Sequence, residues 1–399
     1  MSKAENAREV VVVSGVRTGI GDYGGALKEL AATKLGAVAI REAVARAKIE
    51  PGRVGHVVMG SVIHGEAKDM YLSRVAAIEA GMPVGTPCLT VNRLCGSGLQ
   101  AIVSAAQHLM LGDCDVAVAG GAESMSRAAY FLPAGRWGQR MGDATVVDAM
   151  TGALHDPFGH GHMGVTAENI AAKYGFTRQQ QDEFSISSHR KAARAIEAGY
   201  FKSQIVPIEL KTRKGVEQFT ADEHVRPGAT MEDLGKLKTV FKKDGTVTAG
   251  NASGINDAGA AIVMTSSSFA ERNGVKPMAR LVAYAHAGVE PQVMGLGPIP
   301  AVKRVFEKAG LKPSDMDVVE SNEAFAVQAM AVTRDLGLDP AKVNPNGGAV
   351  ALGHPIGATG AILTVKALYE LERTQKRYAL VTMCIGGGQG IAAIFERSS

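Results

Sequence analysis

The segment Asn92–Gln100 combines a cysteine with a glycine-rich turn at the expected start of a helix. Its sequence is NRLCGSGLQ, in which Cys95 precedes Gly-Ser-Gly and the apolar stretch Leu99–Leu111. The free N–H groups of a helix N-terminus favour an anion, so we expect the pKa of the Cys95 thiol to lie below that of a free cysteine. Glycines also let a substrate approach the backbone closely. Cys95 is therefore a candidate nucleophile, although a small buried cysteine explains this segment alone equally well.

A histidine occupies a second glycine-rich stretch, Asn344–Gly360, with the sequence NPNGGAVALGHPIGATG. Its glycines and two prolines predict neither a regular helix nor a long strand. His354 sits on a turn held by Pro355, where a histidine can act as an acid, a base or a hydrogen-bond donor near neutral pH. A ring that only satisfies loop carbonyls is the alternative. The glycine density disfavours it, because such loops usually contact a ligand.

The segment Val381–Gly390, VTMCIGGGQG, places Cys384 at the end of a predicted buried strand, before three consecutive glycines. The backbone N–H groups of such a loop can form an oxyanion hole. The G-x-G-x-G spacing resembles a dinucleotide loop only weakly. We reject that interpretation, because the sequence up to Ser399 leaves no room for the helix, strand and acidic residue that should follow.

Asn322 follows another predicted strand, in the segment Val319–Phe325, VESNEAF. A side-chain amide at the end of a strand can hold a water molecule or an oxyanion. Taken alone, Asn322 is better explained as a structural loop residue.

Short β-branched runs alternate with helical stretches, and these elements must position the four segments. The predicted helix Leu35–Lys48 has apolar residues at spacings of three and four. This alternation predicts an α/β fold with helices packed on a central sheet. Buried strands are predicted at Val10–Ser14, Val57–Met59, Val116–Ala119, Ala260–Thr265, Ala379–Met383 and Ile391–Phe395.

The second half of the chain repeats the first. Ala39–Gly60 and Ala301–Glu320 each read as a helix, a turn around a proline and a hydrophobic strand, shifted by 262 residues. The same shift aligns Gly98 with Gly360, each at the start of an apolar helix. Each half then has a strand that runs into a glycine pair, Gly120–Gly121 or Gly386–Gly387. The repeat predicts two similar α/β domains packed face to face.

An insertion of about 130 residues separates the predicted strands at Ala119 and Ala260, which is too long for a structureless loop. Thr177 and Gln180 form a capping-box pattern at the start of a helix predicted to end near Ala198 and Gly199. Insertions on a repeated scaffold often carry binding function.

The composition is that of a globular protein, with 399 residues, 46% apolar and 21% charged, and a net charge of +4. The four cysteines match neither a disulfide framework nor a CxxC metal motif, which favours reduced thiols in a reducing compartment. Met1–Glu9 has no signal core, and no apolar run predicts a transmembrane helix. Lysines cluster in Lys211–Lys214 and Lys236–Lys243, where a solvated face is favoured over a polyanion patch. No nucleic-acid-binding motif is present.

Together the four segments resemble the thiolase family, the acetyl-CoA C-acyltransferases. The motifs NRLCGSG, NEAF, NGGxxxxGHPxGxxG and CxGGGxG occur in this order and spacing, and the match runs from Val11–Gly21 to the last strand. The chain looks closest to bacterial biosynthetic-type β-ketothiolases. Thr359, where the family often has Ser, Ser124, where Asn is common, and Pro345 are the departures.

The resemblance implies a thiolase-like α/β fold with two repeated domains, each with a mixed five-stranded sheet packed in layers. Residues 1–124 with 255–275 would form the first domain, residues 125–254 an inserted loop domain that binds coenzyme A, and residues 276–399 the second domain. It also implies a cytoplasmic homotetramer, a dimer of dimers, that works in fatty-acid metabolism or in polyhydroxyalkanoate or ketone-body-type biosynthesis.

The resemblance further implies a reversible Claisen condensation of two acyl-CoA molecules, acetyl-CoA with acetyl-CoA or with propionyl-CoA, and thiolysis of 3-ketoacyl-CoA. Cys95 would carry the acyl group as a thioester, and His354 would activate Cys95 and help bind the thioester oxygen. Cys384 would be the general acid or base. Asn322 would hold a water at one oxyanion hole, and the backbone N–H groups of Cys95 and Gly386 would form the other.

Coenzyme A would be carrier and substrate, and no further cofactor, nucleic acid or membrane partner is expected. Its phosphates explain the basic residues of the insertion better than nucleic acid does. His160 and His162 suggest a metal only weakly, because no third ligand is in sight. The family's positions for coenzyme A correspond to Arg226 near the nucleotide, Ser253 near the pantetheine, and Leu154, His162, Met163, Phe241, Ala249, Met294, Ala324 and Phe325 along the channel.

Three alternatives compete with this interpretation. A decarboxylating condensing enzyme of the ketoacyl-synthase type pairs one cysteine with two histidines or with His and Asn, and Cys384 disfavours it. A Cys–His hydrolase would need a water-accessible thioester. A coenzyme A- or lipid-binding scaffold without activity is disfavoured by the presence of Cys95, His354 and Cys384 together.

Overall fold

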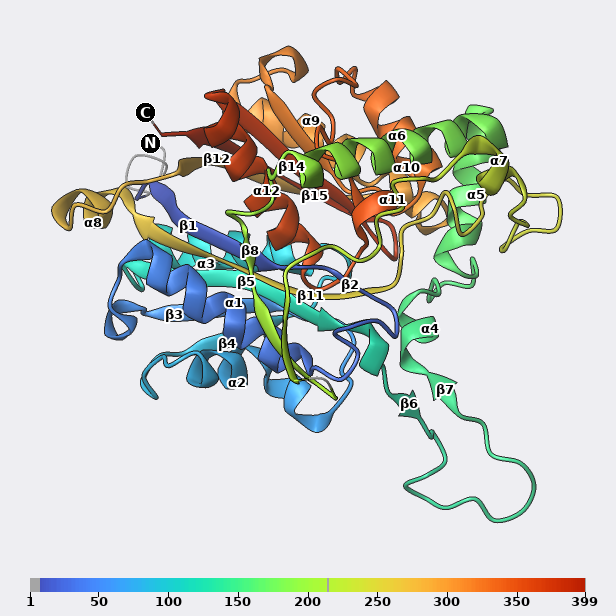
Figure 1. Cartoon of the computed structure of the whole chain (residues 1–399), viewed down its shortest axis with the longest axis horizontal. Coiled ribbons are helices and arrows are strands. Elements are labelled where there is room, and N and C mark those ends of the chain that lie inside the picture. The colour runs from blue at the N-terminus through green and yellow to red at the C-terminus, as the bar shows by residue number, and fades with distance from the viewer. Residues whose placement is uncertain (1–7, 214, 399) are drawn as a thin grey trace.

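The computed structural model shows a protein built of two similar α/β halves (Figure 1). It describes residues 8–213 and 215–398. Lys214, at one end of a predicted basic cluster, and Met1–Ala7 lie outside the described residues. The predicted buried strands are confirmed, and most are longer than expected. The first half orders its strands β4-β3-β5-β11-β1 and the second β13-β14-β15-β12. Their bounds are β1 (Val10–Thr18), β3 (His56–Gly60), β4 (Cys88–Val91), β5 (Val116–Ser124), β11 (Asn256–Ser266), β12 (Ala279–Gly288), β13 (Val318–Ser321), β14 (Tyr378–Ile385) and β15 (Gln389–Arg397).

The strand directions show that the halves are true repeats. In the first half, β3 is parallel to β5, whereas the pairs β5–β11 and β11–β1 are antiparallel. In the second half, β13 is parallel to β14, whereas the pairs β14–β15 and β15–β12 are antiparallel. The partner of β13 that would match β4 is reduced to an isolated bridge between Val319 and Val343. The fifth strand expected in the second half is therefore a single bridge.

The two halves pack as layers, with one pair of helices between the sheets. β1 and β12 join the sheets through only two residue pairs, Val11 with Arg280 and Val12 with Ala279. Helices α1 (Ala32–Ala47) and α2 (Leu72–Glu79) cover the outer face of the first sheet, and α9 (Pro298–Ala309) and α10 (Ala326–Asp335) cover that of the second. The central core contains α3 (Ser97–Leu111) and α12 (Thr359–Thr374), packed against strands of both halves.

Glycines bring the first turns of α3 and α12 into backbone contact. A Cβ atom on Gly360 would lie 2.2 Å from the backbone N of Leu99, and one on Gly98 would lie 2.8 Å from the backbone N of Ala361. These are the two glycines that the repeat aligned. Their contact places the loops that precede the two helices side by side.

Two local predictions are wrong. Gly120 and Gly121 do not end a strand but lie inside β5, where they pair with Ala261 and Ala260 of β11. A glycine is needed at position 121 because a Cβ there would be 2.1 Å from the carbonyl oxygen of Gly357. Gly386–Gly387, by contrast, do form the turn after β14. The stretch around His354 was expected to have no helix, yet it contains the one-turn helix α11 (Ala349–Leu352).

The insertion between β5 and β11 has its own structure. The helix predicted from its capping box is α6 (Arg178–Glu197), with Thr177 and Gln180 making both reciprocal hydrogen bonds. The insertion is anchored on β1 by the Arg17–Asp222 ion pair, 2.7 Å long and fully buried at both ends. Its other elements are β6 (Tyr130–Phe131), β7 (Val147–Asp148), α4 (Ala149–Ala153), α5 (Met163–Tyr174), β8 (Ile205–Val206), β9 (Ile208–Thr212), β10 (Gly215–Phe219) and α7 (Met231–Gly235).

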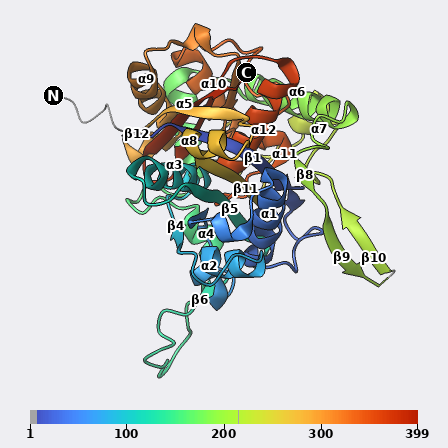
Figure 2. The same ribbon diagram turned by 90° about the vertical axis from the view of Figure 1, so that its left-hand side faces the viewer.

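Two segments of the insertion project from the body. The arm between the end of β5 and α4, residues 128–148, leaves the molecule at the bottom of Figure 2, and the β9–β10 hairpin projects separately. Short elements complete the chain: β2 (Gly21–Asp22), α8 (Ser267–Arg272) and the 3-10 turns Pro51–Arg53, Ala67–Tyr71, Met125–Arg127, Pro291–Leu296 and Pro313–Asp315. Within residues 8–213 and 215–398, no helix has the length and apolar character needed to cross a membrane.

We predict that Gly360→Ala destabilises the protein by about 1–3 kcal/mol, because the new methyl group overlaps the backbone of α3 and must push the helices apart. Thermal unfolding without ligand measures this change. Gly235→Ala in α7 is the control, since nothing lies within 4 Å of a Cβ there. Equal melting temperatures for the two variants would contradict a tight contact.

Candidate active site

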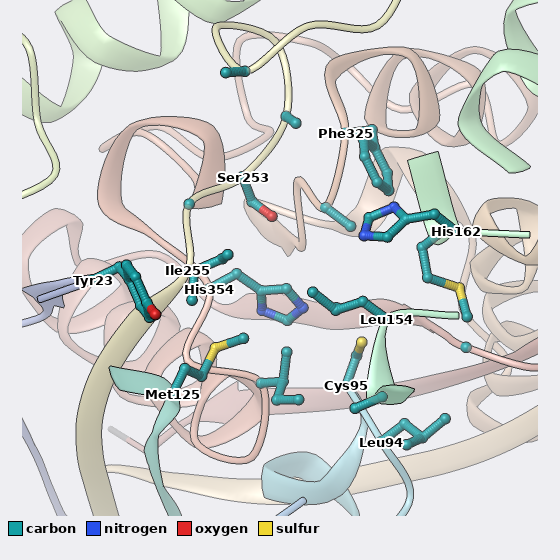
Figure 3. A pocket seen from close by; sticks show the side chains of 18 of the residues that line it. Tyr23, Leu94, Cys95, Met125, Leu154, His162, Ser253, Ile255, Phe325 and His354 are labelled. Carbon is teal, nitrogen blue, oxygen red and sulfur yellow. The ribbon is translucent and has the colours of Figure 1, made fainter. Parts of the chain in front are cut away.

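A cavity of about 500 Å³ brings together Cys95, His354 and Gly386 from the two halves, whereas Asn322 and Cys384 are not among its lining residues. Cys95 enters it from the turn before α3, His354 from the loop before α12, and Gly386 from the turn after β14. Figure 3 shows the Cys95 sulfur and the His354 ring projecting into the same space, opposite His162 and Phe325. Residues more than 250 positions apart thus share one cavity, as the internal repeat implied.

The turn that carries Cys95 is strained and held by a serine. Leu94 has a φ of 45°, a left-handed conformation that a branched side chain rarely adopts. The Ser97 hydroxyl donates to the Leu94 carbonyl over 2.6 Å and accepts from the Arg93 N–H over 2.8 Å. These bonds fix the turn and aim the Cys95 side chain at the cavity.

The expected low pKa of Cys95 is wrong for this structure. Burial raises the pKa of the thiol to about 11, although the backbone N–H of Gly386 is directed at the sulfur and opposes the rise. The nearby Glu123 carboxyl group adds to the rise. The cost of burying an anion exceeds the benefit of the helix N-terminus, so the resting group is a neutral thiol.

His354 is held as a neutral base with a defined tautomer. Burial lowers its pKa to about 4. The Thr359 hydroxyl donates to the Pro355 carbonyl over 3.0 Å, so it accepts the Nδ1–H of His354 over 2.7 Å. This leaves Nε2 without a proton, 3.4 Å from the Nδ2 of Asn322. A neutral imidazole with an unprotonated nitrogen can accept a proton transiently during a reaction.

Cys384 lies behind the cavity wall rather than on it. It is fully buried at the end of β14 and packs in an apolar cluster with Met163, Met294 and Phe325, which do line the cavity. Burial raises the pKa of its thiol, and the neighbouring Cys95 raises it further. The two thiols therefore lie close together in a small apolar region.

Asn322 has the features of an oxyanion or water holder. Its side chain is fully buried, and its Oδ1 has no hydrogen-bond partner among the described residues. A buried polar atom without a partner is costly unless a ligand or solvent satisfies it. Asn322 therefore offers polar atoms beside the Nε2 of His354.

Three residues that the sequence interpretation missed position the site: Glu123, Asn256 and, in this role, Thr359. Glu123 is fully buried at the end of β5 and accepts N–H groups from Val62, Ile63 and Gly357. Burial raises its pKa to about 8, against the effect of these bonds. Asn256 accepts the backbone N–H of His354 over 2.9 Å. No sequence motif indicates a role for Glu123 or Asn256, because only the packing of the folded chain brings them to the His354 loop.

Nine of the ten residues expected to bind coenzyme A line the cavity, and Arg226 does not. Arg226 is exposed beside it and forms a 2.9 Å ion pair with Asp22, which does line the cavity. The segment Lys236–Lys243 runs past the same cavity, because Val240 and Phe241 belong to its wall. Lys211 belongs to β9, in the hairpin that projects from the body (Figure 2).

His162 serves as part of the wall. Its Nδ1 accepts the backbone N–H of Gly164 at the start of α5, and its ring stacks on Phe241 with centroids 4.7 Å apart. Burial lowers its pKa to about 4. Among the described residues, no group of three or more His, Cys, Asp or Glu side chains is placed to hold a metal ion.

Comparisons with known proteins agree with this geometry. Residues 10–268 match the model "Thiolase, N-terminal domain" and residues 275–397 match "Thiolase, C-terminal domain". The chain is 66% identical over 391 residues to the β-ketothiolase BktB of Cupriavidus necator, covering 98% of this chain and 99% of that protein. It is 49% identical to the acetyl-CoA acetyltransferase of Allochromatium vinosum over 97% of this chain and 99% of the relative.

Solved structures give the same result. The Bacillus anthracis acetyl-CoA acetyltransferase matches with a TM-score of 0.97 and 45% identity, over 99% of this chain and all of that one. Human mitochondrial 3-ketoacyl-CoA thiolase in complex with CoA matches with a TM-score of 0.95 and 43% identity, over 98% of both chains. The thiolase-like fold expected from the sequence is confirmed.

We predict that Thr359→Val slows the alkylation of Cys95 by iodoacetamide about ten-fold or more at pH 7–8, because Nδ1–H of His354 loses its buried acceptor. Thr359→Ser keeps the hydroxyl and should react like the wild type. Mass spectrometry of the labelled Cys95 peptide gives the rate. In the wild type the rate should still be rising at pH 9–10, since the pKa of Cys95 is raised to about 11. Equal rates for the Val and Ser variants would show that Thr359 does not position His354.

Proposed function

The chain belongs to the thiolase family, and on this premise we propose that it is a β-ketothiolase that works through an acyl thioester on Cys95. The reactions are the condensation of two acyl-CoA molecules to 3-ketoacyl-CoA and the reverse thiolysis. One observation carries the proposal: Cys95, His354 and the Gly386 turn line a single apolar cavity, with Cys384 buried directly behind it.

The first half-reaction needs a nucleophile and a stabilised oxyanion. Nε2 of neutral His354 takes the Cys95 proton as the sulfur attacks the carbonyl carbon, so no buried thiolate has to persist beforehand. Backbone N–H groups of Cys95 and Gly386 are the donors for the oxygen of the tetrahedral intermediate. The direction of the Gly386 N–H toward the Cys95 sulfur supports this role.

The second half-reaction needs a base for the α-carbon of the incoming acetyl-CoA. Cys384 takes this role, with Asn322 and His354 stabilising the enolate oxygen. The Cys384 thiolate forms in the first half-reaction, when the thiol gives its proton to the departing CoA sulfur, and the raised pKa of Cys384 makes the thiolate a strong base. In thiolysis the same thiol protonates the departing carbon. Thiols, an imidazole and backbone N–H groups provide the nucleophile, the bases and the oxyanion donors for each step. We therefore propose that no cofactor beyond coenzyme A is required.

Coenzyme A would enter along the wall formed by Ser253, Phe241 and Phe325, with its phosphates near Arg226 and the segment Lys236–Lys243. The cavity wall supports this path, since it runs from Cys95 to Val240 and Phe241 beside these lysines. The decarboxylating ketoacyl-synthase alternative is not favoured, because the family models and relatives are thiolases and acetyl-CoA acetyltransferases. We place the enzyme in the cytoplasm, in keeping with its four free cysteines.

We also propose a homotetramer, in which the arm, residues 128–148, contacts a second copy. Its apolar side chains are exposed, with Trp137 at 87% and Met141 at 92%. Clustered apolar groups on a projecting segment usually mark an interaction surface.

Two variants separate the roles of the cysteines. Cys95→Ala should lower thiolysis of acetoacetyl-CoA by CoA at least about a thousand-fold and abolish labelling by radioactive acetyl-CoA, since the nucleophile is lost. Cys384→Ala should retain stoichiometric labelling of Cys95 and lose condensation. A labelled Cys95→Ala protein, or condensation by Cys384→Ala at the wild-type rate, would remove the corresponding role. Cys88→Ala is the control and should change neither reaction.

The arm gives a second test. Replacing Trp137 and Met141 together by Ser should reduce the molar mass in light scattering after size-exclusion chromatography, because the apolar surface of the arm is removed. Leu111→Ser is the control, because Leu111 is an apolar residue outside the arm and is 79% exposed. A wild-type protein that runs as a monomer, or a double variant with unchanged mass, would contradict the proposed assembly.

A further inference from the structure

The guanidinium of Arg226, which is expected near the nucleotide of coenzyme A, is bound by a carboxylate of the protein itself. Its Nη2 donates to Oδ2 of Asp22 over 2.9 Å, and its Nη1 donates to the backbone carbonyl of Glu223 over 2.8 Å. The side chain of Arg226 is 55% exposed and that of Asp22 is 28% exposed. An anion that arrives from solvent can therefore reach the guanidinium, but it meets the Asp22 carboxylate beside it.

Asp22 has other partners, and these hold it in the cavity wall independently of Arg226. Its Oδ1 lies 2.7 Å from Nδ1 of His224 and 3.5 Å from Nδ2 of Asn256. Its backbone N–H donates to the Glu223 carboxyl group over 2.8 Å. Burial raises the pKa of Asp22, but the hydrogen bonds and charges of His224 and Arg226 outweigh burial and lower it. Asp22 is therefore a fixed anion at neutral pH.

Asn256 connects Asp22 to the backbone of the catalytic histidine. Its Oδ1 accepts the N–H of His354 over 2.9 Å, and its Nδ2 donates to the carbonyl of Gly21 over 3.1 Å. Asn256 is fully buried, and a Cβ on Gly353 would lie 2.4 Å from its side-chain amide. The amide has no room to turn, so Asp22 stays in place when a ligand draws the guanidinium outward.

Resting on the proposed function, we propose that Asp22 competes with a phosphate of coenzyme A for Arg226 and thereby limits how tightly coenzyme A and its thioesters are bound. A phosphate on this guanidinium has the Asp22 carboxylate as its neighbour, and the two like charges repel. The ion pair is partly exposed, and pairs of this kind are weak enough to exchange partners.

The reaction gives this competition a use. Each condensation releases one molecule of coenzyme A and one of 3-ketoacyl-CoA from the same channel. A carboxylate that takes the guanidinium back from the departing phosphate favours both releases. The competition concerns the phosphates alone, since the pantetheine arm carries no charge that Asp22 can repel.

Thiolysis of acetoacetyl-CoA with three acyl acceptors tests the proposal: coenzyme A, dephospho-CoA, which lacks the 3′-phosphate, and pantetheine, which lacks every phosphate. Asp22→Asn keeps the size of the side chain and an oxygen acceptor for Asn256, but removes the charge. It should raise kcat/KM for coenzyme A about three-fold or more, the repulsion expected between charges about 6 Å apart in a water-like medium. The gain should lie in KM and should shrink as NaCl rises to about 0.5 M. The kcat/KM for pantetheine should not change.

Two further neutral variants and a matched control complete the experiment. Asp22→Ser removes the same charge with a different side chain, and should give the same gain for coenzyme A. Arg226→Gln removes the cation, and should lower kcat/KM for coenzyme A but not for pantetheine. Asp115→Asn is the control, because it removes a carboxylate from another exposed ion pair, 2.7 Å from Arg8, and changes the net charge equally. It should leave all three acceptors unaffected.

The outcomes separate this proposal from the proposed function. No thiolysis by the wild type with any acceptor would overturn the proposed function itself. Active variants with an equal or lower kcat/KM for coenzyme A at position 22, or an equal gain for pantetheine, would leave that function intact and overturn the competition. An unchanged kcat/KM for coenzyme A in Arg226→Gln would also overturn it. A gain for coenzyme A alone supports competition with the 3′-phosphate, and a gain shared with dephospho-CoA supports competition with the diphosphate.

Discussion

The backbone contact between the first turns of α3 and α12 is the constraint on which the site depends. Gly98 and Gly360 occupy equivalent places in the two halves, and neither has room for a Cβ. Because each helix is preceded by a loop that carries a chemical group, this contact sets Cys95 beside His354. An internal repeat that packs its two central helices against each other thus brings together segments that are far apart in the sequence.

Buried polar groups then hold the glycine-rich loops in place. Glu123 binds the N–H groups of Ile63 and Gly357, which ties the His354 loop to the first half. Lys366, almost fully buried in α12, forms a 2.7 Å ion pair with Glu320 and also donates to the carbonyl of Gly347. Breaking such a pair would leave a buried charge uncompensated, so these groups restrict the loops to one arrangement. Loops rich in glycine can therefore serve as a rigid site.

The apolar surroundings decide the protonation states of the reacting groups. Burial raises the pKa values of Cys95 and Cys384 and lowers that of His354, so the three groups rest neutral. In the proposed mechanism, charges arise only during the reaction, and backbone N–H groups and Asn322 receive them.

The sequence by itself determined the elements, the repeat and the chemical groups. Periodicity predicted the strands and α6, the shift of 262 residues predicted two similar halves, and the motifs around Cys95, Asn322, His354 and Cys384 indicated the family. These features are patterns of neighbouring residues or repeats along the chain, so they can be recognised in one amino-acid sequence. Only the tertiary structure revealed the roles of Glu123 and Asn256 and the neutral state of Cys95. Each of these depends on desolvation or on contacts between segments more than fifty residues apart, and no pattern along the chain records them.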